Sequence, residues 1–288
     1  MIKHVPVMAE ECIAFLNASK GKTIVDCTLG LGGHTKELLN IGCNVISIDR
    51  DEKAIEFAKK ELPKEAVLIN SEFSKLREIL DDLSISKVDG ILADLGVSTY
   101  QLEDDERGFG FKGKLDMRMN PKQKVSAFEI INEDPEEKIS NLLFEYGERR
   151  FANAVARSIC RSRTEKSIET GEELLEIVKR AMPPKYRFSR EHHWATPTFR
   201  ALRMEVNNDL GELKSLISTV PDCLKNKGRL AIISFHSMED KIVKHMFRDY
   251  VKKGIAKVLT KKPILASKEE ISLNPKAQRA KLRAIEIL

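Results

Sequence analysis

The residues best suited to chemistry lie in the stretch 23–49, where glycines and an acid occupy fixed places in an alternating pattern. The segment TIVD is followed by the loop CTLGLGGH, the helix-like TKELLNIG and a second apolar run that ends in Asp49. Gly30, Gly32 and Gly33 let the backbone turn tightly near a ligand, and the next helix points its N-terminal amides at it. A carboxylate at Asp49 can accept hydrogen bonds from ribose hydroxyls. This order predicts a nucleoside-cofactor site.

The spacing of the glycines distinguishes two classes of cofactor. A nicotinamide or flavin fingerprint reads G-x-G-x-x-G, but counting from Gly30 the third glycine position holds Thr35. The pattern D-x-T-x-G-x-G-G, which begins at Asp26, is closer to the loop of S-adenosylmethionine-dependent methyltransferases. An ordinary glycine-rich α/β turn without a ligand stays open as the alternative at this point.

The elements that position these residues alternate between strand and helix as far as Gly96. After the first two strands come the helix DEKAIEFAKKEL, the strand AVLIN, the helix FSKLREILDDL and the strand VDGILADLG. This order predicts a parallel, doubly wound sheet. The next strand, GRLAIISF, begins only at Gly228, although a crossover needs only about a dozen residues. A segment is therefore inserted into the sheet domain.

The inserted segment has a helical pattern. Asp134 and Pro135 are typical of a helix start before EEKISNLLFEYGERRFANAVARSI. We therefore predict an α/β fold in which residues 1–104 and 196–288 form the sheet domain and residues 105–195 form a helical insertion. After GRLAIISF, the pattern predicts a helix over MEDKIVKHMFRDYVKK and a final strand in LRAIEIL.

Composition limits the class of protein. The chain has 288 residues, enough for a packed core, and no apolar run approaches the roughly 20 residues of a membrane span. Its N-terminus, MIKHVPVMAEE, lacks the apolar core of a secretion signal. The five cysteines are widely spread and form no C-x-x-C pair, which indicates reduced thiols and no metal site. We expect a soluble, cytoplasmic protein that does not enter a membrane.

Positive charge is concentrated near the C-terminus. Residues 241–288 contain 13 basic and 4 acidic residues, whereas the whole chain has a net charge of +5. A basic section suits a polyanion such as RNA, and a solvated lysine-rich face fits the same pattern. Within the insertion, Arg150, Arg157 and Arg161 are spaced to share a helical face. That face is either a phosphate-binding ridge or a solvated surface.

Asp94 ends the fourth predicted strand, at the carboxyl edge of the sheet beside the glycine loop. A carboxylate at this edge can accept a hydrogen bond from an exocyclic amine and hold its nitrogen toward a methyl sulfonium. Methyl transfer from a sulfonium is an in-line displacement, so the site must align two groups and remove one proton. A carboxylate that caps a loop is the structural alternative.

Further sequence blocks occur in order along the chain: HVPVM, DCTLGLGGH, DLGVSTYQLEDDERGFGF, LDMRM, EIIN, YGERRFA, FRALRMEVN, ISFHSMEDKIVK and NPKAQRAKLRAIE. Together they resemble the RsmH family, formerly MraW, over nearly the whole chain. The resemblance implies a bacterial enzyme that uses S-adenosylmethionine to methylate the N4 amine of a cytosine in the decoding centre of 16S ribosomal RNA, within the small ribosomal subunit. It also implies a class I, Rossmann-like methyltransferase domain with an inserted helical domain that recognises RNA. The oligomeric state, a homodimer included, is left open.

The resemblance and the positions of the residues in the predicted fold together give candidates for each role. The cofactor-binding candidates are Gly30, Gly32, Gly33, His34, Asp49, Phe73, Asp94 and Gln101. The catalytic candidates are Asp94 and His236, the second of which follows the fifth strand together with Ser237. The RNA-binding candidates are Arg150, Arg157, Arg161 and Arg200. Structural alternatives remain for two of them, since Phe73 could belong to the core and His34 could cap a helix.

One block departs from the family pattern. Where the family typically reads HPATRTFQALRIEVN, this chain reads HWATPTFRALRMEVN, with Trp194, Pro197 and Arg200 at the changed positions that matter most. The change moves a basic group by three positions, so the sequence does not determine whether RNA docking and full activity match those of the family. Two rival functions also remain: a nicotinamide-dependent oxidoreductase, and an RNA-binding assembly factor without catalysis.

Overall fold

The computed structural model describes residues 6–64, 66–187 and 193–288. The chain divides into two compact units, one formed by residues 1–96 with 210–288 and the other by residues 97–209. The second unit contains more residues than the 105–195 insertion expected from the sequence. It takes in the helices α5 (Thr99–Glu103) and α10 (Thr196–Val206), which flank that stretch.

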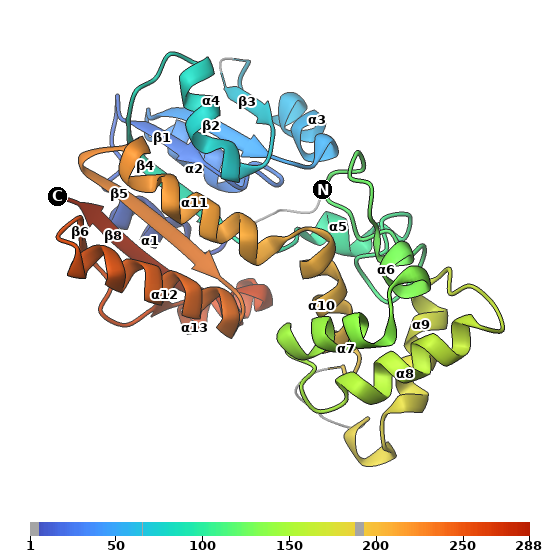
Figure 1. The fold of residues 1–288 in the computed structure, drawn as a ribbon. Coiled ribbons are helices and arrows are strands. Elements are labelled where there is room, and N and C mark those ends of the chain that lie inside the picture. The colour runs from blue at the N-terminus through green and yellow to red at the C-terminus, as the bar shows by residue number, and fades with distance from the viewer. Residues whose placement is uncertain (1–5, 65, 188–192) are drawn as a thin grey trace. The chain divides into compact units, whose positions relative to one another are not determined.

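The first unit is built on one sheet with the strand order β3-β2-β1-β4-β5-β8-β6, and β7 pairs with β8 (Figure 1). The strands are β1 (Thr23–Asp26), β2 (Asn44–Asp49), β3 (Val67–Asn70), β4 (Val88–Asp94), β5 (Leu224–Ser234), β6 (Ala256–Val258), β7 (Ile264–Leu265) and β8 (Lys281–Ile287). The five strands from β1 to β5 pair in parallel, and β8 is antiparallel to its neighbours. The predicted α/β fold with a mostly parallel sheet is confirmed.

The direction of winding reverses between β1 and β4. The chain proceeds from β1 outward to β2 and β3, and then returns to place β4 on the other side of β1. In open parallel sheets, ligands bind outside the carboxyl ends of the strands at such a switch point. The loop after β1 and the end of β4 are therefore the places where this fold positions a site.

Helices cover both faces of the sheet. They are α1 (Ala9–Leu16), α2 (Gly33–Asn40), α3 (Glu52–Glu61), α4 (Leu76–Asp82), α11 (Asp209–Cys223), α12 (Ser237–Lys252) and α13 (Lys268–Leu273), with the short turns η1 (Phe73–Lys75) and η3 (Pro275–Arg279). Successive residues of β1 alternate between the faces, as a strand requires: Ile24 packs with α1 and α2, whereas Val25 packs with α4, α11 and α12. Because both faces are covered, the central strands β1 and β4 are buried along most of their length.

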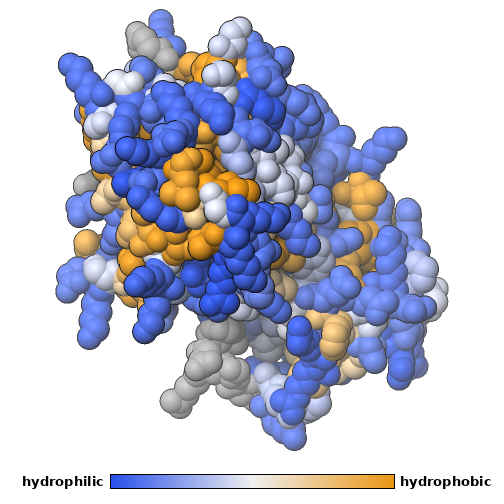
Figure 2. Space-filling view, turned by 60° about the vertical axis from the view of Figure 1, so that its left-hand side comes forward, coloured by the Kyte–Doolittle hydropathy of each residue, from blue (hydrophilic) through white to orange (hydrophobic). Residues whose placement is uncertain are grey.

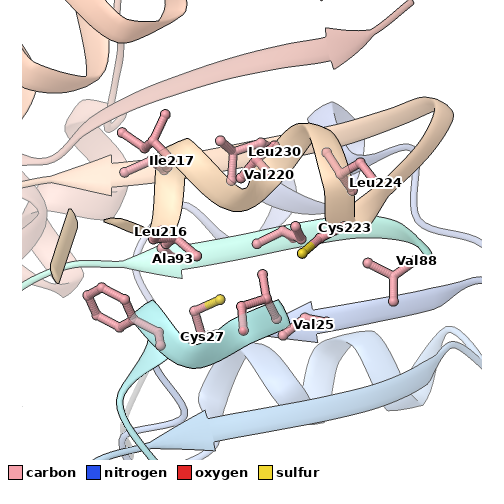
Figure 3. Packing of buried hydrophobic residues seen from close by; sticks show 14 of the residues in the cluster. Val25, Cys27, Val88, Ala93, Leu216, Ile217, Val220, Cys223, Leu224 and Leu230 are labelled. Atoms are coloured by element: carbon pink, nitrogen blue, oxygen red, sulfur yellow. The ribbon is translucent and has the colours of Figure 1, made fainter. Parts of the chain in front are cut away.

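Figure 3 shows how the α11 face of the sheet is packed. Leu216, Val220 and Cys223 of α11 lie over side chains of β1 and β4, among them Val25 and Ala93. All five are fully buried. This packing fixes the strands whose ends carry the acids of the site.

The outer surface is mostly hydrophilic. On the face shown in Figure 2, hydrophilic residues predominate and hydrophobic residues gather in one larger patch and a few smaller ones. Among the residues that the structure describes, no helix is long and apolar enough to cross a membrane.

The second unit is helical, with its own core. Besides α5 and α10 it contains α6 (Ala127–Glu133), α7 (Glu136–Glu145), α8 (Ala152–Arg163), α9 (Gly171–Ala181) and the turn η2 (Pro184–Tyr186). The continuous helical pattern expected from residue 136 onward is divided into α7 and α8. Gly147 adopts a φ of 112°, which a continuing helix does not allow. As a result Arg150 precedes α8 and does not share a helical face with Arg157 and Arg161, contrary to the expectation.

A loop before α6 is held by close backbone contacts. A Cβ atom on Gly113 would lie 1.7 Å from the carbonyl oxygen of Asp105, and Gly113 has a φ of +78°. The buried Asn207 side chain accepts a hydrogen bond from the Met119 amide at 2.8 Å and donates one to the Met117 carbonyl at 2.7 Å. These contacts explain how an irregular segment between two helices stays ordered.

Candidate active site

The glycine loop begins directly after β1 and is anchored to both neighbouring strands. The Cys27 amide donates to the Leu92 carbonyl at 2.8 Å, and the Leu29 amide donates to the Ile48 carbonyl at 3.0 Å. Gly32 has a φ of 80°, and a Cβ there would lie 3.3 Å from the Leu62 side chain. Because α2 starts at Gly33, the loop places the N-terminus of this helix at the switch point.

Asp49, at the end of β2, closes this loop from the other side. Its Oδ2 accepts a hydrogen bond from the Gly30 amide at 2.8 Å, and its Oδ1 accepts one from the Asp51 amide at 2.9 Å. Burial raises the pKa of Asp49 to about 6, although these two amide hydrogen bonds act in the opposite direction. The side chain is partly exposed, and each oxygen retains a second lone pair that can accept a hydroxyl.

We expect Asp49→Ala to weaken S-adenosylmethionine binding at least about tenfold, since hydrogen bonds to a charged group contribute roughly 1.5–3 kcal/mol. In the wild type, cofactor affinity should also fall as the pH falls through about 6, because protonation removes the charged acceptor. Isothermal titration calorimetry across a pH series measures both effects.

The variant provides the control for this pH dependence, because Asp49→Ala should abolish it. Stability should respond with the opposite sign. The folded-state pKa of about 6 lies above the ordinary 3.8, so the folded state holds the proton more tightly between these values. The contribution of Asp49 to the free energy of unfolding therefore falls as pH rises through that range. A folded Asp49→Ala variant with unchanged cofactor affinity would remove Asp49 from the site.

A buried polar network supports the loop from below. Asp26 is fully buried; its Oδ2 accepts a hydrogen bond from the Thr35 hydroxyl at 2.7 Å, and its Oδ1 accepts one from the Thr28 amide at 3.1 Å. The Thr35 and Ser47 hydroxyls are 2.8 Å apart. Burial raises the pKa of Asp26. From the sequence, Asp26 and Thr35 were identified only as positions in the glycine-loop pattern, and the network was not predicted. The signal that could have revealed it is the presence of polar residues within apolar runs.

Asp94 and His34 face each other where β4 ends. His34 Nε2 lies 3.5 Å from Asp94 Oδ2, and the side chains are 7% and 21% exposed. The Asp94 amide donates to the Thr28 hydroxyl at 2.7 Å, which ties this end of β4 to the glycine loop. Among the described residues, buried Asp94 Oδ1 and His34 Nε2 have no hydrogen-bond partner. Buried polar atoms without partners indicate a place where a ligand supplies them.

The electrostatics of His34 follow from this contact. Burial alone would lower the pKa of the imidazole, but the nearby carboxylates, Asp94 first and then Asp26, raise it above its ordinary value. The imidazolium form is thereby favoured beside Asp94. His34 is the second residue of α2, so its side chain reaches Asp94 rather than capping the helix, which has Gly32 as its N-cap.

Phe73 and His236 both follow strands at the same carboxyl edge of the sheet, and each makes contacts within the protein. Phe73 opens η1 after β3, is 8% exposed and packs in the core. His236 is the N-cap of α12: its Nδ1 accepts from the Glu239 amide at 3.5 Å and its Nε2 lies 2.8 Å from Glu239 Oε1. Glu239 Oε2 in turn accepts from the Phe235 amide at 3.0 Å. Glu239, which sequence reasoning missed, is signalled by its capping-box spacing to His236.

The remaining candidates lie in the second unit. Gln101 is the third residue of α5, where its Oε1 accepts from the Ser98 amide at 3.0 Å in a capping box. Arg157 pairs with Glu136 at 3.6 Å, and Arg200 lies on α10, where its charge acts on the buried Glu148.

Two of the changed positions fit their places, Pro197 within α10 and Trp194 just before it. Pro197 is in the first turn, where a missing amide hydrogen is tolerated. Trp194 packs against the core of the unit, with its ring centroid 4.8 Å from that of His193.

The residues at the switch point fit a nucleoside cofactor. Gly30 and Gly32 adopt positive φ angles that turn the loop sharply, Asp49 offers acceptors for a ribose diol, and Asp94 and His34 present polar atoms without hydrogen-bond partners among the described residues. Among the described residues, no group of three or more His, Cys, Asp or Glu side chains could hold a metal ion.

Comparison with known proteins places this arrangement in a family. The chain is 43% identical to the ribosomal RNA small subunit methyltransferase H of Kosmotoga olearia over 293 residues, covering 98% of this chain and 97% of the relative. It is likewise 43% identical to the enzyme of that name from Thermosipho africanus, covering 99% and 97%. S-adenosylmethionine is the methyl donor that the sequence predicts for such enzymes. The model of the MraW methylase family matches residues 1–288, and the chain belongs to this family.

Proposed function

We propose that the protein transfers a methyl group from S-adenosylmethionine to the N4 amine of a cytosine in the decoding centre of 16S ribosomal RNA. The observation that carries the proposal is Asp94, whose buried Oδ1 lacks a partner among the described residues and which stands beside the glycine loop. The relatives carry the name of a small-subunit ribosomal RNA methyltransferase, which supports the class of substrate.

The reaction requires side chains that orient the amine nitrogen and accept its proton. The lone pair of a cytosine N4 amine is delocalised into the ring, so the nitrogen is a weak nucleophile until an N–H is engaged by an acceptor. Asp94 supplies that acceptor, orients the nitrogen and takes the proton that the amine must lose. When bound, the cofactor supplies a methyl sulfonium, so the N–C bond forms as the S–C bond breaks.

His34 and His236 are proposed to act through position. His34 Nε2 lies 3.5 Å from Oδ2 of Asp94 and helps to position this carboxylate, which is 21% exposed, for the amine. The ring of His236 is engaged by Glu239 on both nitrogens, so we assign it to shaping the turn after β5 and not to proton transfer. Gln101 and Phe73 remain proposed cofactor contacts from the family pattern alone.

The proposed substrate form is the assembled small subunit. A cytosine in structured RNA must be splayed out before its N4 can reach a sheet edge, and phosphate contacts then provide most of the affinity. Arg150, Arg157, Arg161 and Arg200 are the proposed contacts of the second unit, and the basic section 241–288 provides others.

The test is methylation of purified small subunits that lack the mark, with isotope-labelled S-adenosylmethionine and mass spectrometry of the nucleosides. We expect N4-methylcytidine in subunits and much less in a short hairpin that carries the target cytosine. Label in another nucleoside would overturn the assignment of the reaction, and equal labelling of the hairpin would overturn recognition of the particle. Cofactor binding without transfer to any RNA would favour an assembly factor that has lost catalysis.

A further inference from the structure

A compact group of aromatic and cationic side chains lies on the surface of the second unit, apart from the residues discussed as catalytic. We name it the Arg150 platform; it consists of Phe144, Arg149, Arg150, Phe151, Lys185 and Tyr186. Its members come from the end of α7, the turn before α8 and the turn η2. The sequence indicated Arg150 as a basic residue, but gave no sign that Tyr186 lies beside it.

Arg150 and Tyr186 form the centre of this platform. The guanidinium carbon of Arg150 lies 4.1 Å from the centroid of the Tyr186 ring, and its Nη2 donates a hydrogen bond to the Tyr186 hydroxyl. The ring of Phe151 is 5.2 Å from that of Tyr186. Arg150 is exposed, and its guanidinium carbon also lies 5.8 Å from the centroid of the Phe151 ring.

The positive charges of the platform are not neutralised by the protein. Arg149, Arg150 and Lys185 make no ion pair with any carboxylate of residues 6–64, 66–187 and 193–288. Some other cations of the unit are paired, for example Lys138 with Asp134 at 2.9 Å and Lys166 with Glu173 at 2.7 Å. Three neighbouring unpaired cations repel one another, and a polyanion relieves that repulsion.

Prolines and hydrogen bonds constrain the turn that carries Tyr186, which reduces the entropy lost on binding. Pro183 and Pro184 precede Tyr186, and the Tyr186 amide donates to the Pro183 carbonyl at 3.0 Å. Arg187 closes the turn with hydrogen bonds from Nε and Nη2 to the Met182 carbonyl at 2.9 and 2.7 Å. A preorganised ring needs little reordering when a ligand stacks against it.

We propose that the Arg150 platform binds single-stranded RNA, with one unpaired base stacked against the exposed Arg150 guanidinium and the flanking phosphates held by Arg149 and Lys185. Planar guanidinium and aromatic groups stack on the face of any base, and this is how proteins hold unpaired nucleotides. The inference deepens the proposed function, on which it rests for the identity of the polymer. It gives the helical unit a site for an unpaired nucleotide in addition to phosphate contacts.

The test is fluorescence titration of a single-stranded RNA oligonucleotide that carries 2-aminopurine, whose emission is quenched by stacking. Arg150→Lys keeps the charge but loses the plane, and Tyr186→Leu removes the supporting ring. Each should weaken binding at least about fivefold and reduce the quenching. Tyr186→Phe, which keeps the ring, and Lys166→Ala, which removes a paired cation of the same unit, should stay within about twofold of the wild type.

Salt dependence separates stacking from charge. Arg150→Lys should leave the slope of log affinity against log salt unchanged, whereas Lys185→Ala should reduce it by about one. Unchanged affinity and quenching in Arg150→Lys would overturn the proposal. This variant tests base stacking even if Tyr186→Leu does not fold. Methylation of small subunits by the wild type is measured in parallel. If methylation is absent but the quenching still depends on Arg150, the proposed function is rejected and RNA binding by the Arg150 platform is supported.

Discussion

Asp94→Asn should lower the single-turnover rate of methyl transfer by about a hundredfold or more, while RNA affinity stays within about threefold of the wild type. Asparagine keeps the shape but is neutral, so it polarises the amine less and cannot take its proton. The substitution also removes the charge beside His34, whose Nε2 lies 3.5 Å from Asp94 Oδ2. Since Asp94 raises the pKa of His34 against the effect of burial, that pKa should fall in the variant.

A matched control lies at the opposite end of the same strand. Asp89 is a partly buried acid of β4 whose Oδ2 accepts hydrogen bonds from the Thr23 amide and from Lys225 Nζ, both at 2.9 Å. Asp89→Asn makes the same chemical change at the far edge of the sheet, so its rate of transfer should stay near that of the wild type. An Asp94→Asn enzyme that transfers the methyl group at the normal rate, with saturating cofactor and RNA, would make Asp94 a structural residue.

Gly113→Ala should destabilise the helical unit by about 3 kcal/mol or more, since a left-handed φ and a clash act together. The added Cβ would lie 1.7 Å from the Asp105 carbonyl oxygen, so the loop before α6 cannot keep its backbone path. Gly21→Ala is the control for φ alone: Gly21 has a φ of +83°, and nothing lies within 4 Å of its Cβ position. We expect that variant to lose only about 1 kcal/mol.

Urea denaturation followed by circular dichroism measures both glycine variants. We expect a much lower midpoint for Gly113→Ala than for Gly21→Ala. Equal, small losses would mean that the loop rearranges freely and does not order the unit.

The sheet and its acids could be predicted from the sequence because they depend on local patterns. Short apolar runs, the glycines after β1 and the acids that end β2 and β4 are all visible in the order of the residues. The helix α12 and the strand β8 were likewise predicted, and the structure confirms them at Ser237–Lys252 and Lys281–Ile287.

What could not be predicted depends on tertiary contacts. The packing of α7 against α8 and α10 decides whether Gly147 ends a helix or lies inside one. Sequence periodicity carries no information about this packing. The contact of His34 with Asp94 joins residues sixty positions apart, so only the fold reveals it. Arg150 and Tyr186 meet for the same reason, since they lie on two turns separated by α8 and α9.

The most direct test of the account is the modification state of small-subunit ribosomal RNA in cells that carry or lack this protein. Mass spectrometry of RNA fragments locates N4-methylcytidine. We predict the mark on a single decoding-centre cytosine in the presence of the wild-type protein, its loss when the protein is removed, its return with the Asp89→Asn protein and its continued absence with the Asp94→Asn protein. A mark that persists without the protein, or that Asp94→Asn restores in full, would contradict the account.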